Sequence, residues 1–141
     1  MKKSIFILLT ILLNACEIIQ IGEKPQEVKT IIVARENPVG AVLLFKAELD
    51  SNNIPAATEY LATPTGHRIL AIDKLNIYDE LPMLKNKLKG LEISNIYQQN
   101  IEDNLVRINI EFSYIRNLIC DTKKIDSLFF IINYKFEKNY N

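Results

Sequence analysis

The chain has 141 residues, and its 17 lysine and arginine side chains are balanced by 17 aspartate and glutamate side chains. This length corresponds to one domain of roughly 100 to 200 residues, which can bury a core without metal ions or disulfides. Balanced charge excludes the broad basic surface that attracts nucleic acid, so no nucleic-acid partner is expected.

The first sixteen residues, MKKSIFILLTILLNAC, have the parts of a bacterial export signal. Lys2 and Lys3 form a basic start, and an apolar run follows over residues 5–13. This run is shorter than the roughly 20 apolar residues that a membrane-spanning helix needs. We therefore expect residues 1–15 to be a signal peptide that is removed.

The residues Leu13-Asn14-Ala15-Cys16 resemble the lipobox of bacterial lipoproteins, although Asn14 is a less usual occupant of its position. The resemblance implies that the Cys16 thiol takes a diacylglyceryl group, and that the new amino terminus takes a further acyl chain such as palmitate. Each buried methylene contributes about 0.8 kcal/mol, so two or three chains give firm anchoring. The alternative is an ordinary secretory signal with a cysteine near the cleavage site by chance.

A lipidated Cys16 implies a protein anchored in the cell envelope, with the membrane as its partner. The residue directly after Cys16 is Glu17, and not the aspartate that would resemble an inner-membrane retention signal. This difference favours the outer membrane in a Gram-negative host. Lipidation also leaves Cys120 without a partner for an intrachain disulfide. We expect Cys120 to be a small apolar residue inside a strand.

Residues 16–27 predict the lipidated cysteine followed by a flexible tether, and residues 28–141 predict a single α+β domain. The β-branched run Val28–Ala34 predicts a first strand. Asn37 and Pro38 are a cap and a first-turn proline, and they predict a helix that ends near residue 50. Further helices are expected over residues 54–62, from Thr63-Pro64 onward, and from a cap at Asp79 to Gly90, with a core stripe of Leu81, Leu84 and Leu88.

After Gly90 the hydrophobic period changes from 3.6 to 2, and strands are predicted over residues 91–99, 105–114, 117–122 and 128–136. One face of the second strand is expected to carry Val106, Ile108, Ile110, Phe112 and Tyr114. One face of the last is expected to carry Phe130, Ile132, Tyr134 and Phe136. Helices followed by antiparallel strands predict an α+β fold, with the N-terminal helices packed on one face of a curved sheet.

The stretch NPVGAVLLFKAELDSNNIPAATEYLA, residues 37–62, resembles the opening of small exported domains of the nuclear transport factor 2-like (cystatin-like) superfamily. The resemblance implies a cone in which helices and a bent sheet enclose a pocket. In catalytic relatives that pocket holds acid and base groups. In many exported relatives it binds a ligand or partner, or is filled.

The residues themselves predict no catalytic, cofactor-binding or metal site. One histidine and one distant free cysteine cannot supply a tetrahedral metal site, and no phosphate-binding loop or nucleophile elbow occurs. The preferred hypothesis is a membrane-tethered, non-enzymatic domain that binds a small apolar ligand or an envelope protein. The alternative is a small envelope isomerase or dehydratase that uses two groups of the set His67, Asp73, Tyr78 and Tyr114.

Five tyrosines and one pair of neighbouring carboxylates are the remaining candidates for functional residues. Asp79 and Glu80 are neighbours on a predicted helix and so do not converge on one point. Five tyrosines could line a pocket or an apolar patch, although most such residues are core or rim residues; they are Tyr60, Tyr78, Tyr97, Tyr114 and Tyr134.

Overall fold

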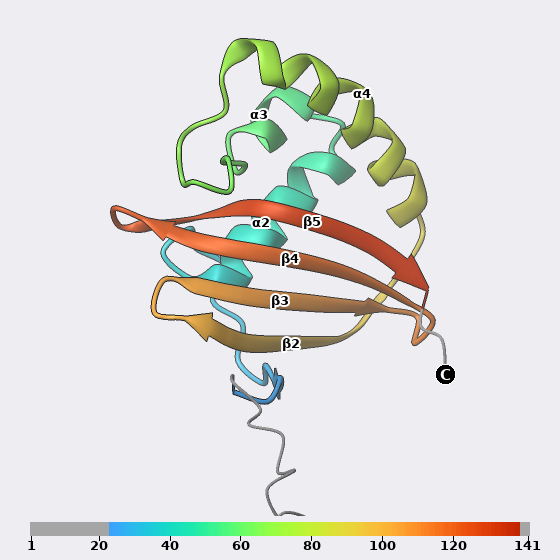
Figure 1. Ribbon diagram of the computed structural model, residues 1–141. Coiled ribbons are helices and arrows are strands. Elements are labelled where there is room, and N and C mark those ends of the chain that lie inside the picture. The colour runs from blue at the N-terminus through green and yellow to red at the C-terminus, as the bar shows by residue number, and fades with distance from the viewer. Residues whose placement is uncertain (1–22, 139–141) are drawn as a thin grey trace, which may run out of the picture.

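A computed structural model describes residues 23–138, and it has three helices packed on a curved antiparallel sheet, of which all strands but the short β1 follow the helices (Figure 1). The strands lie in the order β1-β2-β3-β4-β5. This arrangement confirms the predicted α+β class and the packing of N-terminal helices on a curved antiparallel sheet. The elements are β1 (Gln26–Glu27), α2 (Pro38–Asp50), α3 (Ile54–Thr58), α4 (Ala71–Leu88), β2 (Ile93–Glu102), β3 (Leu105–Phe112), β4 (Arg116–Ile125) and β5 (Leu128–Lys138).

Helix α2 is the buried helix of the fold. The Asn37 side chain accepts a hydrogen bond of 3.1 Å from the Gly40 amide, and Pro38 occupies the first turn, as predicted. The helix crosses one face of the sheet and contacts β3, β4 and β5 (Figure 1). Its buried side chains, at helical spacing, are Val39, Val42, Phe45 and Leu49.

The inner face of β3 carries the alternation that the sequence predicts as far as Phe112. Val106, Ile108, Ile110 and Phe112 are buried, but Tyr114 is 69% exposed. The predicted strand is too long because Ser113 and Tyr114 adopt left-handed backbone conformations in the turn to β4, with φ of 50° and 59°. Tyr114 therefore leaves the inner face.

The predicted face of β5 is wrong in its first half. Thr122 pairs with Ile131 and Asp121 pairs with Asn133, so one residue of β5 is unpaired between them. This bulge shifts the alternation by one position. The side chains that pack on the core are Phe129 and Ile131 before the bulge, and Tyr134 and Phe136 after it.

The helix boundaries after α2 also differ from the prediction. Helix α3 ends at Thr58 and not at residue 62, and the Ala62 amide donates to the carbonyl of Ile131 on β5 instead of to a helical carbonyl. Residues 63–70 form a loop and not a helix, since the Thr63 hydroxyl accepts from the His67 amide and Gly66 has a φ of +88°.

Helix α4 is one helix, so the separate helix expected to start at Asp79 is wrong. Asp79 lies in its middle, and the helix continues through Pro82. An internal proline removes one hydrogen bond. We attribute the continuity of the helix to the buried stripe of Leu81, Leu84 and Leu88, which packs in the core as predicted. Gly90, just after the helix, has a φ of +74°.

The strand expected over residues 28–34 is also wrong. The edge strand β1 is formed by Gln26–Glu27, which pair with Tyr97 and Gln98 of β2. These two residues belong to the predicted tether, of which residues 16–22 lie outside the described residues. Beyond Val28, the chain bends toward α2.

Gly40 lets this N-terminal segment lie directly against α2. A methyl group at Gly40 would overlap backbone atoms of Ala34 and Ile32. The segment therefore requires a residue without a side chain here, and the contact sets the position of Arg35, the next residue after Ala34.

We predict that Gly40→Ala lowers the free energy of unfolding. Alanine raises helix propensity by about 1 kcal/mol relative to glycine, but here its Cβ forces the backbone of residues 32–34 away from α2. Urea denaturation checks the sign. Ala47→Gly, at an exposed position of α2, is the control and should lose only the propensity difference. A Gly40→Ala protein more stable than wild type would contradict the close contact.

Candidate functional site

A cavity of about 190 Å³, here called the basic pocket, lies where the helices meet the end of the sheet nearest the β4–β5 turn. Its walls come from the segment before α2, the end of α3, the loop of residues 59–70, the first turn of α4 and the start of β5. The lining residues are Arg35, Thr58, Glu59, Leu61, Arg68, Ile69, Lys74, Leu128 and Phe130.

Arg35 is the most constrained cation of the basic pocket. Its guanidinium lies over the rings of Tyr60 and Phe130, 4.6 and 4.7 Å from their centroids. Nη2 donates to the backbone carbonyl of Glu59 at 2.9 Å, and the Arg35 carbonyl accepts from the Phe129 amide at 2.8 Å. The buried Nε has no acceptor among the described residues, so one donor of a fixed, charged group is unsatisfied.

Two further cations, Lys74 and Arg68, share the one carboxylate of the pocket. Lys74 Nζ donates to Glu59 Oε1 at 2.9 Å. The pKa of Glu59 is lowered, first by Lys74 and also by the charges of Arg68 and Arg35. Three positive side chains from separate elements therefore act on one negative side chain, and the pocket carries excess positive charge.

A second cavity of about 230 Å³, here called the apolar groove, lies beside the basic pocket. Leu61 and Ile69 line both cavities. At the groove the Tyr134 hydroxyl donates to Glu80 Oε2 at 3.0 Å, which connects β5 to α4. The lining residues are Leu61, Ala62, Ile69, Ile77, Glu80, Ile131, Ile132, Asn133 and Tyr134.

The hydroxyl of Tyr134 stays protonated over the ordinary pH range. Burial raises its pKa, and the hydrogen bond and charge of Glu80 raise it further. The phenol is therefore a neutral donor that is already used by Glu80. The groove offers a ligand the aliphatic side chains of its lining together with polar atoms, including those of Glu80 and Asn133.

A larger hollow of about 340 Å³ lies on the outer face of the sheet, and it is more open to solvent than the basic pocket is. Its lining includes Tyr97, Ile119 and one charged residue, Arg107. Arg107 is already paired with Asp121, with Nε donating to Oδ1 at 2.7 Å. This hollow therefore lacks the excess charge of the basic pocket.

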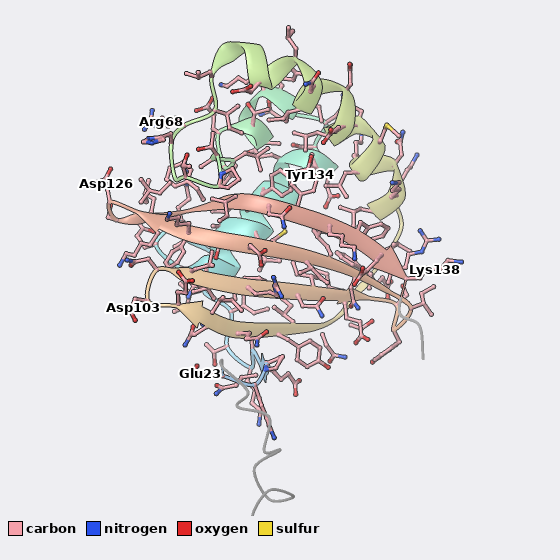
Figure 2. All side chains as sticks on the ribbon, in the orientation of Figure 1. Glu23, Arg68, Asp103, Asp126, Tyr134 and Lys138 are labelled. Atoms are coloured by element: carbon pink, nitrogen blue, oxygen red, sulfur yellow. The ribbon has the colours of Figure 1, made fainter. Side chains whose placement is uncertain are left out.

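The structure does not bring the four predicted acid and base candidates together. His67 lies in the loop, Asp73 and Tyr78 lie on α4, and all three are exposed. Tyr114 lies in the β3–β4 turn. That turn is at the Lys138 end of the sheet, whereas Arg68, next to His67, is at the Asp126 end (Figure 2). None of the four lines the basic pocket or the apolar groove.

Cys120 and three of the five tyrosines singled out in the sequence have different surroundings. Cys120 is fully buried in β4, which confirms the expected apolar role, and burial raises its pKa so that the reactive thiolate is disfavoured. Tyr60 packs on the core and against the Arg35 guanidinium, and Tyr134 packs on the core and lines the apolar groove. Tyr78 is exposed on α4. Sequence reasoning did not single out Arg35, Glu59, Arg68 or Lys74, which no motif connects.

Residues 23–138 contain no group of three histidine, cysteine, aspartate or glutamate side chains that could hold a metal ion. In the same range, no helix has the length and apolarity needed to cross a membrane. Comparison of the chain with protein-family models, with curated proteins and with solved structures finds no match.

We predict that Lys74→Gln raises the pKa of Glu59 toward its ordinary value of 4.5, because the largest stabilising partner of the carboxylate is removed. NMR titration of the side-chain carboxyl measures this shift, which should shrink at high salt. The lowered pKa means that Glu59 stabilises the wild-type fold above pH 4.5, and that this contribution is lost as the pH falls through the lowered pKa. Lys87→Gln, in the last turn of α4, is the control. An unchanged Glu59 pKa in Lys74→Gln would contradict the ion pair.

Proposed function

We propose that the protein is a lipid-anchored protein of the bacterial cell envelope whose folded domain is a non-enzymatic binding module. The anchor part is supported by the lipobox-like Leu13-Asn14-Ala15-Cys16 after a basic and apolar start. Cys16 carries the lipid, and the outer membrane is its location if the host is Gram-negative. The described residues begin at Glu23, so these features lie outside them.

We further propose that the domain adopts the nuclear transport factor 2-like cone. Support comes from the order of the elements, with a proline-led helix and an alanine-rich helix before a bent antiparallel sheet. Leu61 and Ala62, at the end of the stretch that resembles this superfamily, lie against Ile131 of β5. The family supplies an architecture and no particular reaction.

The position of the cavities is the observation that favours a binding function over a catalytic one. The space between α2 and the sheet is occupied by large buried side chains, among them Phe45, Phe112 and Leu118. The two cavities at its edge are lined by cations, aliphatic residues and two carboxylates that are already paired, Glu59 with Lys74 and Glu80 with Tyr134. The four predicted acid and base groups lie elsewhere, so a site that can hold a ligand but whose carboxylates are engaged favours a binding module.

Cys16→Ser tests the anchor. Cells fed with radiolabelled palmitate should label the wild-type protein, and the variant should lose both the label and its membrane association, because serine lacks the thiol that takes the lipid. Cys120→Ser, which keeps the lipobox, is the control and should still be labelled. Unchanged labelling and fractionation of Cys16→Ser would refute the anchor.

A further inference from the structure

We propose that the basic pocket and the apolar groove together bind an organic carboxylate with a short aliphatic chain. The carboxylate would lie in the basic pocket near Arg35 and Arg68, and the chain in the groove toward Ile131. This inference rests on the proposed function, because it names the ligand class of the binding module.

Charge is the first argument for an anionic head group. Arg35, Arg68 and Lys74 face the pocket with only Glu59 to balance them. Arg35 is held in place by two aromatic rings and a backbone carbonyl before any ligand arrives. A fixed guanidinium loses little conformational freedom on binding, and its planar donors match a carboxylate.

The basic pocket offers a limited set of donors to an anion. Glu59 remains in the pocket and offsets part of the charge of its three cations, so the net positive charge that a ligand meets is modest. The Thr58 hydroxyl, the other polar side chain of the lining, already donates to the carbonyl of Pro55 at 2.7 Å. The available donors are therefore the basic head groups alone, which suit one carboxylate.

The adjoining groove supplies the argument for an aliphatic chain. Leu61 and Ile69 line both cavities, so the basic pocket and the groove are neighbours that share an apolar boundary. Beyond them lie Ile77, Ile131 and Ile132, and the Tyr134 hydroxyl at the groove is occupied by Glu80. A chain placed there buries the apolar surface of these side chains, and the paired Tyr134 hydroxyl does not lose a partner.

Calorimetric titration of residues 17–141, expressed without the leader, tests the proposal with octanoate, octanol, acetate and phosphate as probes. The buried core cluster extends from Val39 to Ile131, so this chain carries all of it. Octanoate should bind, and lengthening the chain from acetate should raise affinity by about fourfold per methylene until the groove is filled. Octanol and phosphate should bind at least tenfold more weakly than octanoate.

Two variants locate the head group. Arg68→Gln and Lys74→Gln should each weaken octanoate binding roughly tenfold, which is the usual scale for losing one charge-assisted hydrogen bond. Lys87→Gln, at the other end of α4, should bind as wild type does. Circular dichroism of each variant before titration confirms that the fold is intact.

Three results would overturn the proposal. Octanol that binds as well as octanoate would show an apolar site only, and phosphate that binds as well would show an unspecific anion site. Octanoate binding that is unaffected by both cation variants would place the ligand elsewhere. The palmitate labelling of Cys16 does not depend on any of these results, so failure of the ligand and failure of the anchor are distinguishable.

Discussion

The burial of one side of α2 against the sheet is the interaction on which the rest of this structure depends. Helices of this length are not stable alone in water, so α2 needs the apolar surface of β3, β4 and β5. Phe45 of α2 and Phe112 of β3 are both fully buried, and a large side chain of this kind contributes roughly 1.5 to 3 kcal/mol on burial. Gly40 extends the contact to the preceding segment, and the backbone of that segment carries Arg35 to the edge of the core.

The two cavities follow from how the chain returns from α3 to the sheet. Tyr60 and Ala62 exchange backbone hydrogen bonds with Ile131, which fixes the start of the loop on β5. The rest of the loop then spans the distance to the first turn of α4. The basic pocket and the apolar groove lie along this loop, between the first half of α4 and β5. The site is therefore at the junction of helices and sheet, while the core beneath it is closed.

Local patterns in the sequence predicted the elements whose cause is local. The cap at Asn37, the stripe of α2 and the alternation of β3 are readable because each depends on neighbours in the chain. The bulge in β5 depends on the register against β4, and the continuity of α4 through Pro82 coincides with burial of its leucines. The candidate site was not predictable because it too depends on contacts between residues that are distant in the sequence. Arg35 and Glu59 are 24 residues apart, and Glu59 and Lys74 are 15 apart, so only the tertiary fold brings these charges together.

A ligand that binds at the junction of the loop, α4 and β5 should change the NMR signals of the residues there. The most direct measurement is a heteronuclear NMR titration of residues 17–141 with octanoate, followed through the side-chain Nε–H signal of Arg35 and the backbone amides. The Arg35 signal should move together with amides of residues 59–74 and 128–134. Shifts confined to the outer face of the sheet around Tyr97 and Ile119, with the Arg35 signal unmoved, would contradict this binding site.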